Sequence, residues 1–462
     1  MLDDKLEEYA KRDDYPFHMP GHKRRELLME NPYHIDVTEI PGFDNLHEPA
    51  GLILEVMEKM ADIYHAKKTY LLVGGSTCGN LAAFSAAVPV GASVIIGRNC
   101  HKSIYHGALL RQAKIHYTIP CQNELGFVDY TPLKEYENIL NENPDIAAIV
   151  VTSPTYEGML EPIDEIVSLA HSRKIPVIVD AAHGAHLGFH PYFGKSILES
   201  GADAVIMSLH KTLPALTQTA LLHVGNNSLI DEKMIETYLD VYETSSPSYV
   251  LMSSICKCAK FLEDSKEKFE IYVNRLQSFY KDCGKLRNLK VEKRFNQDPS
   301  KIIIETKNTS MTGHALEVIL REKYGLVLEM SSFNYGLAMT SVMDTEQGFL
   351  RLKNALFEID DIQTISCEKL HVTPKLYEPS QQVLSYHEAM DAKKIEVPLL
   401  EAAGMVAGNF VAIYPPGIPL LVPGERIHKE TIDVLVEAKN QGLQINGLTD
   451  TEGLFIVDYK ES

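Results

Sequence analysis

The sequence lacks any long apolar run and is short of positive charge. No apolar segment approaches the ~20 residues that a membrane-spanning helix needs, and the start, from Met1 to Glu8, has no apolar signal core. Lysine and arginine number 44 against 63 aspartates and glutamates, which gives a net charge of −19. This balance disfavours nucleic-acid binding and suits a cationic substrate. We therefore expect a cytoplasmic protein that binds neither nucleic acid nor membrane.

Paired cysteines and metal-ligand spacings are also absent. The seven cysteines are scattered, with no Cys-x-x-Cys pair, so we expect reduced thiols. His183 and His186 are close in sequence, but they follow a predicted strand and no glutamate accompanies them. We therefore expect no metal site. The glycine-rich residues 73–80 lack the spacings of both Walker and dinucleotide-binding loops.

The chain does contain a regular alternation of apolar strands and amphipathic helices. Strands are predicted at Ser93–Gly97, Ile146–Thr152, Pro176–Asp180, Ala204–Ser208 and Ala220–Val224. Helices are predicted at Asn80–Val88, Ser103–Ala113, Ile163–Ser172 and Lys195–Ser200. Continuously apolar strands between helices indicate an α/β fold, with a large, mostly parallel sheet covered by helices on both faces. Ligands of such sheets bind at the carboxyl ends of the strands.

The second half of the chain has a different pattern. A chain of 462 residues exceeds one hydrophobic core, so two or three domains are expected. A long charged helix from Lys257 to Asn288 is predicted to bridge two of them. A small α+β domain follows, with strands at Lys301–Thr306, Leu326–Met330 and Gly336–Val342 and helices at Thr312–Gly325 and Thr345–Ile359. Residues 373–390 are predicted to run over the surface, and residues 414–417 to form a rigid turn.

Two charged residues stand at the ends of apolar strands. Lys211 follows the strand Ala204–Ser208, and a lysine in an apolar pocket can become the neutral amine that attacks an aldehyde. Asp180 ends the preceding strand, where a carboxylate could keep the ring nitrogen of pyridoxal phosphate protonated. Each residue alone has a simpler interpretation, a solvated strand end for Lys211 and a turn cap for Asp180.

A glycine-rich turn supplies a third feature. Gly74-Gly75-Ser76-Thr77 precedes a predicted helix, and the free amides of a helix N-terminus attract anions such as phosphate. A glycine turn with an ordinary Ser/Thr cap is the alternative. An anion cradle, an aspartate and a lysine, each at a strand end, together indicate a pyridoxal 5′-phosphate site.

These motifs belong to a longer set that runs nearly end to end. In chain order they are Phe17-His18-Met19-Pro20-Gly21-His22-Lys23, Asp44-Asn45-Leu46-His47-Glu48-Pro49, Gly75-Ser76-Thr77, Asn99-Cys100-His101-Lys102-Ser103, Asp180-Ala181-Ala182-His183-Gly184-Ala185-His186, Ser208-Leu209-His210-Lys211, Tyr414-Pro415-Pro416-Gly417-Ile418-Pro419 and Pro423-Gly424-Glu425. With them the chain resembles the ornithine/lysine/arginine decarboxylase family of the aspartate-aminotransferase-like (fold type I) pyridoxal phosphate enzymes. It is most similar to the short bacterial arginine decarboxylases.

The resemblance implies a role for each matching residue. Lys211 would bind the cofactor covalently, Asp180 would pair with its ring nitrogen, and His101 would stack on the ring. The residues around the phosphate would be Ser76, Thr77, Ser208 and His210. His183 stands where some relatives have a tryptophan near the ring hydroxyl. For His101 and His183 an ordinary core histidine is the alternative.

The resemblance also implies a domain order and an assembly. Residues 1–50 would contribute to the active site or a dimer contact, residues 51–290 would form the cofactor-binding domain, residues 291–372 a small α+β domain, and residues 373–462 a C-terminal decarboxylase-type domain. Larger relatives carry an N-terminal wing domain that assembles decamers, whereas this chain reaches Pro-Gly-His-Lys by residue 23. We therefore expect a homodimer or a dimer of dimers.

The implied reaction is decarboxylation of a basic L-amino acid in polyamine metabolism. Arginine to agmatine is expected ahead of lysine to cadaverine and ornithine to putrescine. The cationic tail needs an acidic partner, for which Glu425, Asp44 and Glu48 are candidates, although each is equally well interpreted as a solvated surface carboxylate. An aminotransferase that uses Arg321 or Arg351, another lyase of this fold and a non-catalytic regulatory homologue remain alternatives.

Overall fold

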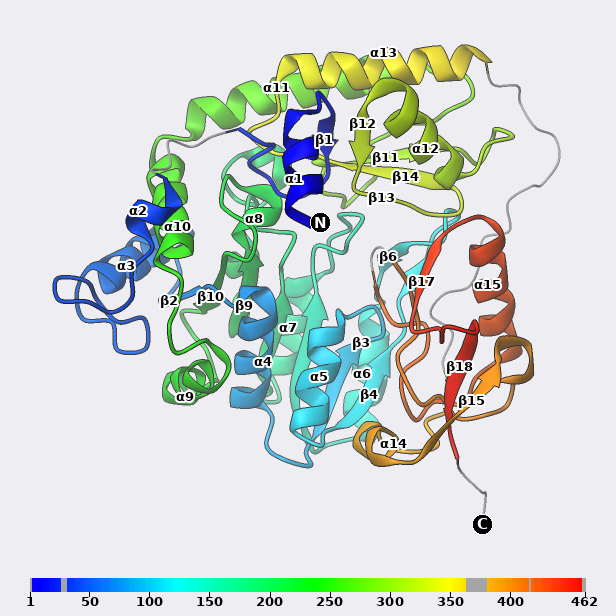
Figure 1. Ribbon diagram of the computed structural model, residues 1–462. Helices are drawn as coiled ribbons and strands as arrows, with labels where there is room; N and C mark the ends of the chain where they lie inside the picture. Colours follow the sequence, from blue (N-terminus) through cyan, green and yellow to red (C-terminus); the bar gives the residue numbers. More distant parts are fainter. Residues whose placement is uncertain (1, 26–30, 363–379, 415–416, 459–462) are drawn as a thin grey trace.

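A seven-stranded sheet forms the centre of the computed structural model, which describes residues 2–25, 31–362, 380–414 and 417–458 (Figure 1). Its strands lie in the order β2 (Lys68–Leu72), β10 (Ala220–Val224), β9 (Ala204–Ser208), β8 (Val177–Asp180), β7 (Ile146–Thr152), β3 (Ser93–Gly97) and β4 (Lys114–Thr118). β10 is antiparallel to both neighbours, and the other pairings are parallel. The predicted, mostly parallel sheet is confirmed.

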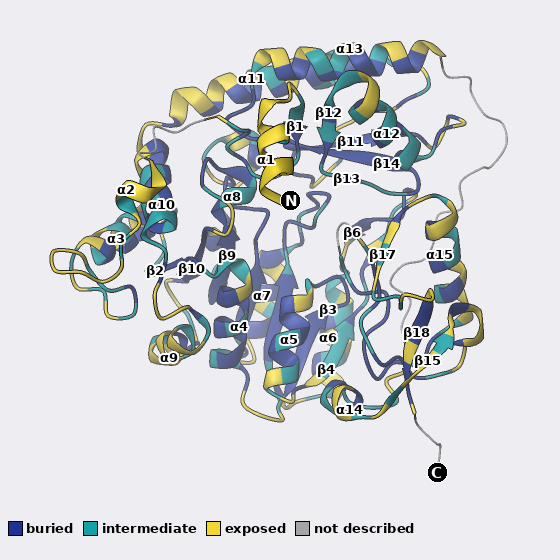
Figure 2. Cartoon of the chain, in the orientation of Figure 1, coloured by how far each residue is buried: buried dark blue, intermediate teal, exposed yellow. Residues whose placement is uncertain are grey.

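Helices cover both faces of this sheet. On one face lie α4 (Gly75–Ala87), α5 (Lys102–Leu110) and α9 (Glu232–Tyr242), and on the other lie α3 (Leu52–Tyr64), α6 (Leu133–Glu142), α7 (Ile163–His171) and α10 (Tyr249–Glu263). Side chains alternate between two cores, so that Val94 and Ile96 of β3 pack on one side and Ile95 on the other. Because both faces are buried, as the dark strands of Figure 2 show, the strands are continuously apolar.

Two of the predicted helices are wrong in form. The long helix expected from Lys257 to Asn288 is broken into α10 and α11 (Lys266–Cys283). Ser265 lies at the break, where its hydroxyl donates to the carbonyl of Leu262 at 2.8 Å and offers the backbone an alternative to a continued helix. The helix expected at Lys195–Ser200 is a 3-10 turn over Ile197–Ser200.

The small domain packs on α11. Its three-stranded sheet has the order β11 (Lys301–Glu305), β14 (Tyr335–Met339) and β13 (Met330–Ser331), with the helices α12 (Gly313–Tyr324) and α13 (Glu346–Ile362). The predicted caps of α12 are both present, since Thr312 accepts from the Ala315 amide and Gly325 adopts a φ of +60°.

The first part of the N-terminal segment joins this small domain. It contains α1 (Leu2–Lys11) and β1 (Tyr15–Phe17), and β1 pairs in parallel with β12 (Leu326–Leu328). The beginning of the chain is therefore tied to a strand more than 300 residues later (Figure 1). Nothing in the local sequence signals this pairing. The short helix α2 (Pro32–Ile35) instead contacts α10 of the sheet domain.

The C-terminal domain has a core of its own. It consists of the helices α14 (Tyr386–Asp391) and α15 (Lys429–Asn440) and two antiparallel strand pairs. These pairs are β15 (Lys394–Pro398) with β18 (Gly453–Val457) and β16 (Ala412–Tyr414) with β17 (Gln444–Asn446). The predicted boundary at residues 372/373, residues 373–379 of the polar segment and Pro415-Pro416 of the predicted turn lie outside the described residues.

Candidate active site

A cavity of about 480 Å³ opens at the carboxyl ends of β8 and β9 and at the start of α4. Most of its lining comes from the central sheet domain, including α8 (Leu209–Thr212) and β6 (Val128–Tyr130), which pairs with β5 (Cys121–Gln122). Met19 enters from the N-terminal segment, and Tyr414 and Ile418 from the C-terminal domain. Segments far apart in the chain therefore build one site.

Eight predicted residues meet in this cavity. They are Ser76, Thr77, His101, Asp180, His183, Ser208, His210 and Lys211. The sequence motifs were spread over more than 130 positions, and the parallel sheet brings them together because its strand ends share one edge.

Lys211 lies just beyond the end of β9, in the short helix α8. Its Nζ is 3.0 Å from Nε2 of His183. Burial lowers the pKa of Lys211, although the charges of Asp180 and Glu329 oppose that shift. Burial and the Lys211 charge also hold the pKa of His183 far below its usual value, so this imidazole is neutral and its Nε2 can accept from the amine.

Asp180 ends β8 and is only 3% exposed. One carboxylate oxygen accepts from Nδ2 of Asn80 at 2.9 Å, and the other from the Ala182 amide at 3.2 Å. Asn80, on α4, also donates to Oγ of Ser103, which lies 2.9 Å from Nδ1 of His101. A hydrogen-bonded chain therefore orients Asp180 and His101 together. Burial lowers the pKa of His101 to about 4.

The glycine-rich turn forms the N-terminus of α4. Gly75 has a φ of +73°, which favours glycine, and the N-cap Gly74 makes no side-chain capping bond. The first amides of this helix therefore remain free to bind an anion. Oγ of Ser76 is 2.7 Å from Oγ of Ser208, which joins the turn to the end of β9. Burial lowers the pKa of the adjacent His210 to about 4.

The three carboxylates suggested for the substrate tail lie elsewhere. Glu425 is fully buried and pairs with Arg98, its Oε2 accepting from Nη2 at 3.0 Å. Asp44 accepts from the amides of Gly51 and Ile53 at the start of α3, so it acts as a helix cap. Glu48 is exposed and lines a separate cavity next to α9. None of the three lines the cavity that contains Lys211.

Sequence reasoning missed a different carboxylate beside the cavity. Glu329 accepts from the Met19 amide at 2.8 Å and from the Tyr156 hydroxyl, and both donors belong to residues that line the cavity. Its charge also raises the pKa of Lys211, against the effect of burial. Glu329 lies within Leu-Glu-Met between two short strands and has no sequence signal that would separate it from a surface glutamate.

The arginines suggested for an aminotransferase also lie outside the cavity. Arg321 donates to Glu317 on the same helix at 2.7 Å, and Arg351 contacts Asp13. Neither is available to hold a substrate carboxylate. Cys100, next to His101, is fully buried, and burial raises its thiol pKa to about 12, which makes the oxidation-prone thiolate inaccessible.

The two histidines considered as a metal pair have separate partners. His183 contacts Lys211, whereas His186 is 3.1 Å from Asp298. Within residues 2–25, 31–362, 380–414 and 417–458, no three His, Cys, Asp or Glu side chains gather closely enough to hold a metal ion. In the same described ranges, no helix is both long and apolar enough to span a bilayer.

Comparison with solved structures shows the fold. The constitutive lysine decarboxylase of Escherichia coli superposes with a TM-score of 0.79 at 21% identity, over 99% of this chain and 82% of that one. A structure titled SPT with PLP superposes with a TM-score of 0.54 at 16% identity, over 66% of this chain and 75% of that one. The predicted fold type I architecture is confirmed.

Comparison with sequences gives the family. The family described as "Orn/Lys/Arg decarboxylase, major domain" matches residues 2–307, and "Orn/Lys/Arg decarboxylase, C-terminal domain" matches residues 370–460. The arginine decarboxylase of Halalkalibacterium halodurans is 32% identical over 96% of this chain and 94% of its own length. The chain belongs to the Orn/Lys/Arg decarboxylase family, as its motifs predicted.

Proposed function

We propose that this chain is a pyridoxal 5′-phosphate-dependent decarboxylase that converts L-arginine to agmatine and carbon dioxide. Family membership supports the reaction and the basic substrate class, and the likeness to arginine decarboxylases favours arginine over lysine and ornithine. One observation carries the proposal. A largely buried lysine, an oriented carboxylate and an uncapped helix N-terminus all face one cavity.

The side chains of the cavity fit this cofactor. The free amides of α4, with Ser76 and Ser208, would hold its phosphate, and Asp180 would hold a protonated ring nitrogen. Nδ1 of His183 is buried and has no hydrogen-bond partner among the described residues, which leaves a polar atom for a bound group to satisfy. His101 would lie against the ring.

Bound there, the cofactor would supply an electron sink for the pair released when the bond between Cα and the carboxylate breaks. Lys211 would hold it covalently. Its protonated amine could give a proton to Cα in place of the lost carboxylate, and burial, which lowers the pKa of Lys211, favours release of that proton. Asp180 would keep its negative charge against the ring nitrogen, held in place by Asn80 and the Ala182 amide.

Glu329 is our choice for the partner of the cationic substrate tail. Its two donors, the Met19 amide and the Tyr156 hydroxyl, belong to residues that line the cavity, so the carboxylate lies directly behind that lining. A planar guanidinium would pair with it through two parallel hydrogen bonds, whereas an ammonium makes a looser contact. Glu425 is already committed to Arg98 and cannot take this role without breaking a buried ion pair.

The test of the reaction is direct. Pure protein with pyridoxal 5′-phosphate is incubated with L-arginine, L-lysine or L-ornithine, and carbon dioxide, amine and keto acid are measured. We expect carbon dioxide and amine in equal amounts, with the highest kcat/KM for arginine. Keto acid without carbon dioxide would overturn the decarboxylase in favour of an aminotransferase, and no turnover at all would favour the regulatory homologue.

A pair of variants tests the substrate tail. Glu329→Gln keeps the shape of the side chain but removes its charge, so KM for arginine should rise about 10- to 100-fold, as for the loss of a charged partner. Glu425→Gln is the matched control, because it neutralises a carboxylate of equal size outside the cavity and should lower stability with little effect on KM. A large rise in KM for Glu425→Gln alone would reverse the assignment.

The assembly also belongs to this proposal. We expect a homodimer or a dimer of dimers in the cytoplasm, with residues such as the exposed Glu48 at or near the contact. Light scattering on purified protein between micromolar and nanomolar concentration would measure the mass. A decamer would contradict this assembly but not the reaction.

A further inference from the structure

The segment of residues 15–23, called the bridging segment below, joins the lysine-bearing turn to the small domain. The amide of Gly21 donates to the carbonyl of His210 at 2.6 Å, and its carbonyl accepts from Oγ of Ser341 at 2.6 Å. A Cβ on Gly21 would lie 2.8 Å from the carbonyl oxygen of Leu213, so the segment packs against α8 without space for a side chain.

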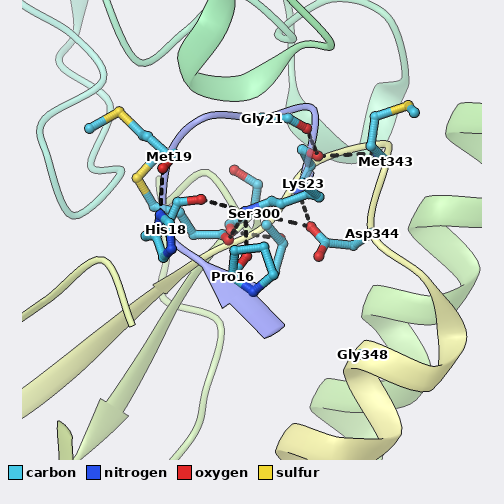
Figure 3. Close-up of polar contacts among 12 residues, drawn as sticks. Pro16, His18, Met19, Gly21, Lys23, Ser300, Met343, Asp344 and Gly348 are labelled. Atoms are coloured by element: carbon cyan, nitrogen blue, oxygen red, sulfur yellow. Dashed lines mark hydrogen bonds and ion pairs between the residues drawn. The ribbon is translucent and has the colours of Figure 1, made fainter. Parts of the chain in front are cut away.

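Lys23 holds the bridging segment in this position. Its side chain is buried, and its Nζ donates to the carbonyls of Pro16 at 3.2 Å, His18 at 3.0 Å and Met339 at 2.7 Å. These three bonds use all the donors of an ammonium group. Asp344, also buried, lies 3.9 Å away and supplies the counter-charge (Figure 3). Through these hydrogen bonds, Lys23 joins the carbonyls of Pro16 and His18 to β14.

The segment reaches the cavity one residue after a carbonyl that Lys23 binds. His18 precedes Met19, whose amide donates to Glu329 and whose side chain lines the cavity. The position of Lys23 thus sets the position of a direct hydrogen-bond donor to Glu329. Glu329 also contributes to the electrostatic environment of Lys23, where its charge opposes the pKa-lowering effect of burial.

Stability alone gives little reason for a lysine at this place. Burial of an ammonium group is costly, and apolar replacements of buried ion pairs are often neutral or stabilising. A charged group with three directed bonds fixes geometry more narrowly than apolar packing does. The arrangement is suited to precise placement of the segment.

We propose that Lys23 is a positioning residue for substrate-tail recognition: through the bridging segment it orients the Met19 amide and thereby the carboxylate of Glu329. The proposal rests on the role of Glu329 proposed above. It assigns a specificity function to a residue that contacts neither substrate nor cofactor.

The experiment uses the holoenzyme and two independent variants. Lys23→Met removes the three bonds and keeps the length of the side chain, and Ser341→Ala removes one bond to the same segment with little risk to folding. For Lys23→Met, KM for arginine should rise about tenfold while kcat changes less than about threefold. The reason is that a displaced Glu329 carboxylate binds the cationic tail of the substrate less tightly. Ser341→Ala should shift KM in the same direction by a smaller factor.

A binding measurement makes the result independent of turnover. Agmatine carries the cationic tail without the carboxylate, and its Kd, measured by calorimetry, should rise about tenfold in Lys23→Met. Asp360→Asn is the matched control, because Asp360 is a buried carboxylate of the same domain that accepts from the amides of Arg287, Asn288 and Leu289 and does not line the cavity. It should lower stability and leave both constants unchanged.

Three results would overturn the proposal. The first is a wild-type KM and agmatine Kd in both variants, and the second is a loss of kcat alone. The third is a wild-type holoenzyme that does not bind agmatine. Absence of turnover with all three amino acids would instead defeat the proposed reaction, and the agmatine comparison would still decide the role of Lys23.

Discussion

At the scale of single residues, surroundings decide which of several buried lysines can act as a nucleophile. The three N–H donors of Lys23 are hydrogen-bonded to backbone carbonyls. Lys301 is fully buried, and burial lowers its pKa to about 8. Only Lys211 of these three lines the cavity. Its amine faces a neutral histidine, which can accept a hydrogen bond from the amine and does not compete for a carboxylate. Sequence position at a strand end predicted that Lys211 lies at the cavity, because the strand end is also the cavity wall.

The first prediction concerns this lysine. Lys211→Ala should abolish the yellow colour of the bound cofactor and lower kcat by roughly a thousandfold or more, as expected for the loss of a nucleophile. Lys211→Arg should do the same, because a guanidinium keeps the charge but cannot become a neutral amine. The measurements are the visible absorption spectrum and the rate of agmatine formation. Normal colour and turnover in the alanine variant would refute the site.

At the scale of secondary-structure elements, the N-terminus of α4 is the anion-binding element of the proposed cofactor site. Its free amides point into the cavity because Gly74 does not cap them and Gly75 turns the chain with a positive φ. Ser76 is held to Ser208, which joins the helix start to the strand end that precedes Lys211. In the proposed site, this element positions the phosphate relative to the lysine.

The second prediction tests this turn. Gly75→Ala should strain the backbone by about 1–2 kcal/mol and raise the Kd of pyridoxal 5′-phosphate about tenfold. Gly91→Ala is the matched control, since Gly91 has a similar φ of +76° and open space around its Cβ position, but lies before the amino end of β3 and is not among the residues that line the cavity. It should lose similar stability without a change in cofactor affinity. Equal effects on cofactor affinity in both variants would speak against a phosphate cradle.

At the scale of the whole molecule, a buried ion pair connects the C-terminal domain to the sheet domain. Arg98, just after β3, donates to Glu425 and to the carbonyls of Pro419 and Leu420. Tyr414 and Ile418 of the same C-terminal stretch line the cavity, and His101 follows Arg98 by three residues. The pair therefore joins the C-terminal domain to the sheet domain without lining the cavity itself.

The third prediction concerns this ion pair. Arg98→Met leaves the Glu425 carboxylate buried and unpaired, so the free energy of unfolding should fall by about 3–5 kcal/mol. Lys59→Met, which removes the exposed pair with Glu263, is the control and should cost less than about 1 kcal/mol. Thermal and denaturant unfolding measure both. Indistinguishable unfolding midpoints for the two variants would show that the pair contributes no more than a surface contact.

The sequence by itself determined five of the seven strands of the central sheet, the α12 caps and the residues at the strand ends. These features depend on local signals, namely apolar runs, capping residues and glycine turns, which act over a few positions. Only the tertiary structure decided which acidic residue stands beside the cavity. Glu425, Asp44 and Glu329 have the same chemistry in the sequence, but one pairs with Arg98, one caps α3 and one accepts from Met19, 310 positions away. Such pairings, like the β1–β12 contact, are set by the packing of distant segments, because burial and long-range hydrogen bonds do not follow from the local pattern.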